Sequence, residues 1–316
     1  MAAGPHTFVT ADVFTAEKYT GNPLAIVSVR NNALSQEKKQ KIAREFNFSE
    51  TVFLHDAEPG KPRQLDIFTP HRELNFAGHP VIGTAHYIFQ KLENDEQLPG
   101  RQGPKSTSLI TKAGNVVVQF DPQRQVAAAE IPHKVNIHAA KTTKDEVLAV
   151  QPGLSSAADI GKMGDSFPVV SIVKGMTFTL VDFSSAPALL TQLKAGEAPK
   201  PELDEGWRES HYGTIFYSQL TPDTETTNVI NRIRVRMICD GIEDPATGSG
   251  CSALATYLAL QKGGKDSRHG FAIEQGVEMG RRSQICIEVK LDASGTGVAG
   301  VTLSGRATFI TEGRLL

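Results

Sequence analysis

Gly78-His79-Pro80-Val81-Ile82-Gly83-Thr84-Ala85-His86-Tyr87 is matched without a gap by Gly248-Ser249-Gly250-Cys251-Ser252-Ala253-Leu254-Ala255-Thr256-Tyr257. The first glycine, one alanine and the tyrosine recur in register, and an acidic residue, Glu73 or Glu243, stands five positions before each first glycine. Each stretch is predicted to begin an apolar helix directly after a glycine turn. The repeat favours two similar domains with one such helix each. Two unrelated helices that pack closely through small residues are the alternative.

Around these two helices the chain is predicted to form many short strands and few other helices. Ser35 is a plausible N-cap for a helix that runs through Phe46, because Glu37 lies in its first turn and Arg44 in its last. A further helix is predicted over 186–194, and loops over 98–105 and 195–209. The expected strands are 7–14, 24–29, 51–54, 65–69, 108–111, 115–120, 167–173, 177–181, 214–219 and 232–238, with more in the tail from 271 to 310.

Composition limits the class of protein. The chain has 316 residues, a net charge of −2 and 40% hydrophobic residues. One core usually stops growing at about 250–300 residues, so two domains are expected. The balanced charge argues against nucleic acid as the main partner. We expect no membrane partner, because no apolar run reaches about 18 residues. The beginning of the chain lacks a basic and then apolar leader, and a cytoplasmic location is therefore expected.

The chain contains three cysteines, Cys239, Cys251 and Cys286. A sparse, odd-numbered set is typical of a reducing compartment without a disulfide framework. None of them stands in CxxC spacing, so no metal site is expected. We interpret all three as small buried residues.

The starts of the two repeated helices are candidate anion sites, since the first backbone N–H groups of a helix have no partner within it. His79 follows Gly78 directly, and Asp244 and Thr247 precede Gly248. Asp244 or Thr247 could instead be an ordinary N-cap. Glu50 stands between a helix end and an apolar strand, where desolvation would raise its pKa into the range of a general acid or base. A solvated loop glutamate is the alternative.

Several longer motifs, in the same order along the chain, resemble the phenazine-biosynthesis PhzF-like family within the diaminopimelate epimerase fold superfamily. The strongest motif is Glu243-Asp244-Pro245-Ala246-Thr247-Gly248-Ser249. The others are Asp12-Val13-Phe14-Thr15, Gly21-Asn22-Pro23-Leu24-Ala25, Phe48-Ser49-Glu50-Thr51-Val52-Phe53, Glu73-Leu74-Asn75-Phe76-Ala77-Gly78-His79-Pro80, Gln275-Gly276, Met279-Gly280-Arg281 and Gly305-Arg306-Ala307.

The resemblance implies an α+β fold of two similar domains, each a mixed β-sheet curled around a central helix. We place the N-terminal domain at 1–122, completed by 304–316, and the C-terminal domain at 123–303. The active site of the family lies in the cleft between the two domains. Members are commonly homodimers that need neither a metal nor an organic cofactor, and the same is expected for this chain.

The resemblance also implies roles for single residues. Glu50 matches the family's acid/base glutamate, and His79, Asp244 and Ser249 match the polar residues that line the cleft beside it. Asn22, Gly78 and Gly248 would bind the substrate, the two glycines through helix N–H groups that face a carboxylate. The racemases of the superfamily use two thiols instead, and these places hold Ala77 and Ala246 in this chain.

The predicted function is that of a cofactor-independent isomerase. It would move a proton and a double bond in a small, unsaturated, carboxylated metabolite by general acid/base catalysis from Glu50. One alternative is a lyase or cyclase of secondary metabolism that uses the same cleft. Another is a metabolite-binding protein without catalytic activity. The motifs name neither the substrate nor the pathway, because a fold does not imply a function.

Overall fold

In the computed structural model, residues 6–30, 34–58, 61–92, 105–221 and 230–316 are described. They divide into two compact units. Unit 1 comprises Met1–Ile131 and Ser304–Leu316, and unit 2 comprises Pro132–Leu303. The crossing therefore lies after Ile131, whereas the sequence placed it after residue 122.

Unit 1 is built on one mixed sheet. In the described residues its strands are hydrogen-bonded in the order β18–β1–β2–β3–β4–β6–β7–β8. The pairs β2–β3 and β4–β6 are parallel, the other pairs are antiparallel, and the short β5 adds to β4. The bounds are β1 Thr7–Val13, β2 Asn22–Val29, β3 Glu50–His55, β4 Arg63–Phe68, β5 Glu73–Leu74, β6 Lys105–Thr111, β7 Gly114–Asp121, β8 Val126–Glu130 and β18 Ala307–Arg314.

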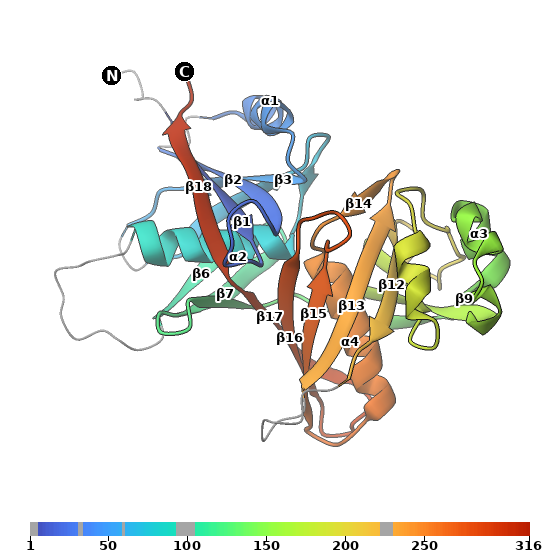
Figure 1. The fold of residues 1–316 in the computed structure, drawn as a ribbon. Helices are drawn as coiled ribbons and strands as arrows, with labels where there is room; N and C mark the ends of the chain where they lie inside the picture. Colours follow the sequence, from blue (N-terminus) through green and yellow to red (C-terminus); the bar gives the residue numbers. More distant parts are fainter. Residues whose placement is uncertain (1–5, 31–33, 59–60, 93–104, 222–229) are drawn as a thin grey trace. The chain divides into compact units, whose positions relative to one another are not determined.

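The central helix of unit 1 is α2, Gly78–Tyr87, which continues as one π-helical stretch, Ile88–Leu92. All ten residues of α2 are buried, and the helix packs against β1, β2, β3, β7, β8 and β18. Figure 1 shows α2 between the β2–β3 and β6–β7 parts of the sheet. Gly83 permits this close approach, because a Cβ there would lie 2.5 Å from Leu24 Cδ2 and 2.9 Å from Val13 Cγ2.

Unit 2 repeats this topology. Its described strands pair in the order β9–β10–β11–β12–β13–β15–β16, with β11–β12 and β13–β15 parallel and the short β14 on β13. Helix α4, Gly248–Lys262, packs against β10, β11, β12, β15 and β16. The bounds are β9 Asn136–Thr143, β10 Ser166–Val173, β11 Met176–Asp182, β12 His211–Gln219, β13 Ile230–Cys239, β14 Ile242–Asp244, β15 Arg268–Gln275, β16 Ser283–Leu291 and β17 Val298–Gly305. The two similar units, each a sheet around one helix, confirm the predicted fold class.

In each unit a buried charged side chain bonds the sheet to the segment that connects two parallel strands. In unit 1 the connection is α1, Gln36–Phe46, capped by the Ser35 hydroxyl as predicted. Its Lys39 forms a buried ion pair with Asp66 of β4, and Asp66 also accepts a hydrogen bond from His55 Nε2 at 2.8 Å. Burial alone would raise the pKa of Asp66, but the bonds from His55 and Lys39 lower it overall.

In unit 2 the connection is a 3₁₀ helix, Pro187–Gln192, and the buried charge has the opposite sign. Arg236 of β13 donates to the carbonyl oxygen of Leu190 at 2.5 Å. Its guanidinium also holds Glu243 through two bonds of 2.8 and 2.6 Å. Burial alone would lower the pKa of Arg236, but the bond and charge of Glu243 raise it. This fork geometry is typical of strong Arg–carboxylate pairs.

Four sequence predictions need correction or fall outside the structure. No strand was predicted between residues 121 and 144, but the structure has β8, whose sequence is mostly alanine, and β9 there. The helix predicted over 186–194 is the 3₁₀ helix Pro187–Gln192. Cys286 is exposed, because it alternates with buried residues along β16, whereas Cys239 and Cys251 are buried as predicted. The loop predicted over 98–105 lies, up to residue 104, outside the described residues.

Three further helical segments are short: α3, Lys144–Val150, and two 3₁₀ turns, Pro152–Ser156 and Ile160–Lys162. They contribute Val147 and Leu154 to a cluster that also holds Phe167, Phe183 and Phe216. Within the described ranges, the helices lack the length and apolar character that crossing a membrane requires.

Candidate active site

Glu50 is the first residue of β3 and lies beside Leu24 of the parallel strand β2. Its side chain is 17% exposed. Burial raises the pKa of Glu50 to about 7, although a hydrogen bond with the Ser49 side chain acts in the opposite direction. The Ser49 hydroxyl donates to Asn22 Oδ1 at 3.1 Å, and Asn22 is buried. The predicted residues Glu50 and Asn22 therefore lie on adjacent strands, joined through Ser49.

His79 lies next to Glu50. Its Nδ1 is 3.5 Å from Glu50 Oε2, and its side chain is buried. It is held there as the second residue of α2, directly after Gly78. The N-cap of α2 is Ala77, which is extended and has no side chain that could cap the helix. The structure thus brings four of the predicted residues together in unit 1: Asn22, Glu50, Gly78 and His79.

The other predicted residues, Asp244, Gly248 and Ser249, lie at the start of α4 in unit 2. Asp244 Oδ1 accepts a bond from Ala246 N at 3.0 Å, and Oδ2 accepts one from Thr247 Oγ1 at 2.7 Å. Neither Asp244 nor Thr247 caps the helix with its side chain, although Thr247 occupies the N-cap position. Asp244 therefore orders the turn before the helix.

Gln275, at the end of β15, supports this turn and was assigned no role from the sequence. The residue is fully buried. Its Nε2 donates to the carbonyl oxygen of Asp244 at 2.7 Å and to Thr247 Oγ1 at 3.0 Å. Its Oε1 accepts from Thr247 N at 3.0 Å and from Cys251 Sγ at 3.3 Å. Only its place in the Gln275-Gly276 motif could have indicated it, because its partners are 24 or more residues away in the sequence.

Gly276 explains why this motif ends in glycine. It has φ +72°, and a Cβ there would lie 2.7 Å from the carbonyl oxygen of Pro245. Only glycine accepts that backbone conformation and contact without strain. The backbone of the Asp244 turn therefore rests directly on the end of β15.

Neither the start of α2 nor the start of α4 has a cysteine at its N-cap that could act as an acid or base. The N-cap positions hold Ala77 and Thr247, so the repeat pairs Ala77 with Thr247 and not with Ala246. Cys251 is fully buried, and its pKa is raised by burial and by the charge of Asp244. A thiol in that state is a poor base and a poor nucleophile.

A Ser–His–Asp arrangement in unit 2 is excluded as a nucleophilic triad by the state of its histidine. His138 Nε2 lies 2.8 Å from Ser171 Oγ, and Nδ1 lies 3.4 Å from Asp204 Oδ2. However, Nδ1 accepts bonds from Asp204 N at 3.2 Å and Asn136 Nδ2 at 3.1 Å. Its proton is therefore on Nε2, which donates to Ser171 and cannot take the proton of the hydroxyl.

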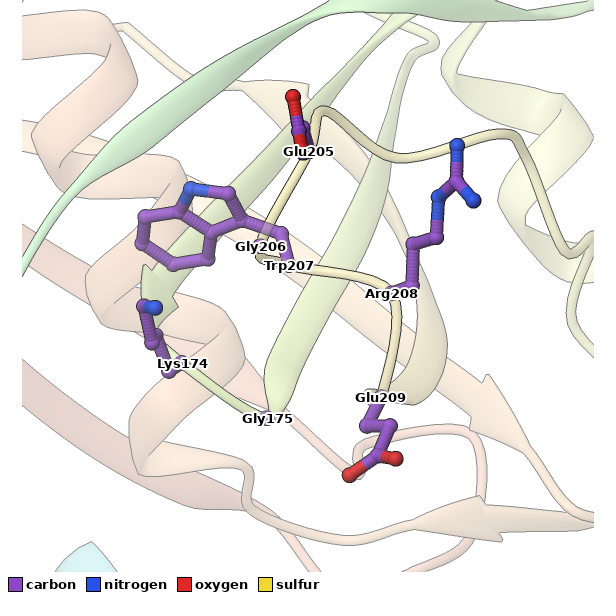
Figure 2. A pocket seen from close by; sticks show the side chains of 7 residues that line it. All are labelled: Lys174, Gly175, Glu205, Gly206, Trp207, Arg208 and Glu209. Carbon is purple, nitrogen blue, oxygen red and sulfur yellow. The ribbon is translucent and has the colours of Figure 1, made fainter.

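A surface hollow of about 600 Å³ in unit 2 is lined by none of the site residues that the sequence predicts. It is lined by Lys174, Gly175 and the loop 205–209. Lys174 Nζ lies 5.8 Å from the centre of the Trp207 ring. Figure 2 shows Glu205, Arg208 and Glu209 spread around the loop, without a common point toward which they converge. This mixture of charges defines no site for one kind of ligand.

Comparison with known proteins identifies the family. The sequence profile of the phenazine biosynthesis-like proteins (PhzC–PhzF) matches residues 11–313. An uncharacterised isomerase of Pasteurella multocida is 44% identical over 290 residues, covering 90% of this chain and 87% of that protein. The trans-2,3-dihydro-3-hydroxyanthranilate isomerase of Pseudomonas aeruginosa is 28% identical over 315 residues, covering 98% and 99%.

The fold is shared with solved structures of the same family. The PhzF-family protein of Bacillus anthracis superposes with a TM-score of 0.74 at 18% identity, covering 99% of this chain and all of that one. The chain belongs to the phenazine biosynthesis-like family and has its diaminopimelate epimerase-like fold. It is an enzyme of the isomerase class.

Proposed function

We propose that the protein moves a proton between two carbons of a small, unsaturated carboxylate, with Glu50 as the general acid and base. The observation that carries this proposal is the position of Glu50, a mostly buried carboxyl group with a pKa raised to about 7 and with His79 3.5 Å away. A group whose pKa lies near the working pH is present in both protonation states, as an acid/base catalyst requires.

The step needs one carboxyl group and no other reactant. Glu50 in its carboxylate form takes a proton from an sp³ carbon next to a double bond, and the electron pair of that C–H bond shifts the double bond. The electrons of the original double bond move to its far carbon, and the same carboxyl group gives a proton to that carbon, which restores the carboxylate of Glu50. His79, beside Oε2, orients the carboxyl group during both transfers.

The substrate carboxylate is proposed to bind at helix starts. Neither α2 nor α4 has a side-chain cap, so backbone N–H groups at Gly78 and Gly248 are oriented for an anion and supported by the helix dipole. Such donors would also stabilise the negative charge that develops when the carbon acid loses its proton. Asn22, Asp244 and Ser249 are proposed to bind the remaining polar groups of the substrate.

The name of the Pseudomonas aeruginosa relative gives a chemical class for that substrate. Its substrate is a hydroxylated dihydro-anthranilate, which is a cyclic, unsaturated amino acid with a carboxylate. We therefore propose a cyclic, partly unsaturated carboxylate as the substrate of this protein.

The test is an incubation in deuterated water, followed by NMR and mass spectrometry. The probes are trans-2,3-dihydro-3-hydroxyanthranilate and a panel of cyclic β,γ-unsaturated carboxylates. We expect a product that contains one solvent deuterium at a defined carbon and is otherwise unchanged in mass. Glu50→Gln is expected to lose about 10³–10⁴-fold in kcat, while Glu50→Asp retains part of it. An unaltered rate in Glu50→Gln would contradict the role of Glu50, and loss of water from the product would indicate a lyase.

A further inference from the structure

His211, Cys239 and Asp240 bring three different metal-binding groups to one corner of unit 2. One nitrogen of His211, the sulfur of Cys239 and one carboxylate oxygen of Asp240 all lie within 4.8 Å of one another. His211 Nδ1 and Asp240 Oδ2 are 3.4 Å apart. Cys239 is buried, His211 is 20% exposed and the Asp240 side chain is 69% exposed, so the group opens to solvent on one side.

The backbone holds these residues in place. His211 is the first residue of β12, and its N–H donates to the carbonyl oxygen of Gly175 at 2.9 Å. Cys239 ends β13, the antiparallel neighbour of β12, and pairs with Ile242 of β14. Asp240 and Gly241 form the two-residue turn between β13 and β14, with φ of 47° and 79°. Two positive φ values and an Asp-Gly sequence are typical of a type I′ hairpin turn, so the position of Asp240 is set by the turn.

A second fixed contact brings another carboxylate to the same turn. The N–H of Gly241 donates to the carbonyl oxygen of Gly196 at 3.1 Å. The next residue, Glu197, lies so close that a Cβ on Gly241 would be 3.8 Å from its Oε1. The turn that carries Asp240 therefore has a second carboxylate, Glu197, beside it, which favours a bound cation.

We propose that His211, Cys239 and Asp240 bind one Zn²⁺ ion, with water as the fourth ligand. Zinc takes tetrahedral sites of sulfur, nitrogen and oxygen ligands at about 2.0–2.3 Å, which places ligand atoms about 3.3–3.8 Å from one another. The His211–Asp240 distance of 3.4 Å already matches this geometry. The exposed Asp240 side chain can adjust its rotamer to complete it, and the thiol of Cys239 releases its proton to solvent when the ion binds.

The ligand types select the class of cation. Ca²⁺ and Mg²⁺ prefer sites made of oxygen ligands, whereas a thiolate and an imidazole suit Zn²⁺ and its analogue Co²⁺. The site escaped the sequence analysis because its ligands come from two strands and a turn. His211 is 28 residues from Cys239, so no CxxC or HxxxH spacing exists.

A bound ion would join β12 to the β13–β14 hairpin. The same hairpin ends at Asp244, which orders the start of α4. Metal binding would therefore stabilise the support of the α4 helix start, a role that does not depend on the proposed reaction.

The test is a titration of the full-length, metal-free protein with Co²⁺ under a thiol-free reductant. We expect one equivalent to bind, with a thiolate-to-cobalt charge-transfer band and intense visible bands of a tetrahedral ion. One equivalent of Zn²⁺ should displace the cobalt and raise the melting temperature. Cys239→Ser should abolish the charge-transfer band, and His211→Ala should weaken Zn²⁺ binding at least tenfold. Cys286→Ser, which changes the exposed cysteine, should leave both unchanged.

Circular dichroism of each variant shows whether it is folded, and His211→Ala keeps the test valid if Cys239→Ser does not fold. The proposal is overturned if cobalt binds without a charge-transfer band or if the band persists in folded Cys239→Ser. It is equally overturned if His211→Ala binds Zn²⁺ as tightly as the wild type, which would leave only a His–Asp ion pair at this corner.

Discussion

The two units have the same topology but differ at the position that matters most for the proposed chemistry. Thr51 lies opposite Phe68 in unit 1, and Thr214 lies opposite Ile238 at the same place in unit 2. The residue before each threonine is Glu50 in unit 1 and Gly213 in unit 2. A Cβ on Gly213 would lie 3.0 Å from both Phe178 Cδ1 and Met237 Cε, so apolar atoms occupy the space there. Unit 1 therefore has the Glu50 carboxyl group at this position, whereas in unit 2 the side chains of Phe178 and Met237 fill the corresponding space.

The same registers place two buried charges of opposite sign at one position. Ile67 lies opposite Val52, and Met237 lies opposite Ile215, so Asp66 of unit 1 corresponds to Arg236 of unit 2. Both side chains tie the connection between two parallel strands to the sheet, one through Lys39 and the other through the carbonyl oxygen of Leu190. In both units a charged side chain at this position bonds the connecting segment. The sign of the charge depends on the partner in that segment, which is the Lys39 ammonium group in unit 1 and the Leu190 carbonyl oxygen in unit 2.

Moving the carboxylate from unit 1 to unit 2 should abolish activity, which is the largest effect that we expect. In the double variant Glu50→Gln/Gly213→Glu, unit 2 has Ser249 at the position that corresponds to His79, and the new side chain is expected to overpack the core at a cost of about 1–3 kcal/mol. Turnover in the deuterium assay should stay about 10³–10⁴-fold below that of the wild type. Recovery of activity would show that the two units are interchangeable in this respect.

Breaking either buried charge pair should strongly destabilise the protein. Asp66→Asn leaves Lys39 in the core without its counter-ion, and Arg236→Met does the same to Glu243. Each should lower the free energy of unfolding by about 3–5 kcal/mol. Urea denaturation monitored by circular dichroism measures the loss. A cost below 1 kcal/mol for either variant would contradict its role as an anchor, and the exposed pair Lys41–Glu37 provides a control with little expected effect.

Glu50 should make stability depend on pH in a way that Gly213 cannot. The folded-state pKa of about 7 lies above the ordinary value of 4.5, so the unfolded chain ionises first as the pH rises. The protonated Glu50 is therefore well tolerated below pH 4.5, and stability is lost between pH 4.5 and about 7, by up to about 3 kcal/mol. Glu50→Gln should be more stable than the wild type at pH 8 and similar to it at pH 4.5. Equal stabilities at pH 8 would contradict the raised pKa.

Gln275 should act as a positioning residue for the start of α4. Gln275→Ala removes the bonds to Asp244 and Thr247 and is expected to lower kcat about 10–100-fold, with KM changing less. The pH limb that Glu50 sets near 7 should remain in place. Gln275→Glu restores the acceptor for Thr247 N but not the donor for Asp244, so it should rescue little. A purely structural role would lower the melting temperature and leave kcat per folded molecule unchanged.

The smallest change in stability is expected at the buried threonine that both units have at the same sheet position. Thr51 and Thr214 are both fully buried, and neither Oγ1 has a hydrogen-bond partner among the described residues. Valine has the same shape without the hydroxyl, so Thr51→Val and Thr214→Val should each be neutral or stabilising, within about 1 kcal/mol. Destabilisation by more than 2 kcal/mol in thermal unfolding would reveal a partner that these hydroxyls need.

Local signals in the sequence predicted the helices and several strands. The Ser35 cap and the Gly78 and Gly248 turns are short-range features, and the structure places helix starts at each. Strands β8 and β9 were missed because pairing with neighbouring strands stabilises them, and the alanine-rich sequence of β8 gives little local signal. The predicted helix over 186–194 is the 3₁₀ helix Pro187–Gln192, a difference that nothing in the local sequence explains.

The candidate site was only partly accessible from the sequence. The resemblance gave Glu50 and His79, and the structure places them 3.5 Å apart. The Gln275-Gly276 motif marked the position but not the role of Gln275, because all its bonds join residues that are distant in sequence. Lys39 illustrates the same limit, since nothing in a charged helix distinguishes the one lysine whose counter-ion, Asp66, lies on a strand 27 residues away.

The pairing of β1 with β18 bears on the order in which the chain is assembled. Residues Ala307–Arg314 form the strand that lies against Thr7–Val13, so the sheet of unit 1 joins segments that are about 300 residues apart in the sequence. During synthesis the ribosome makes this strand only after all residues of unit 2. Unit 2, which is continuous in sequence, can fold first, and the N-terminal half waits with an open strand edge that a chaperone or a neighbouring chain can contact.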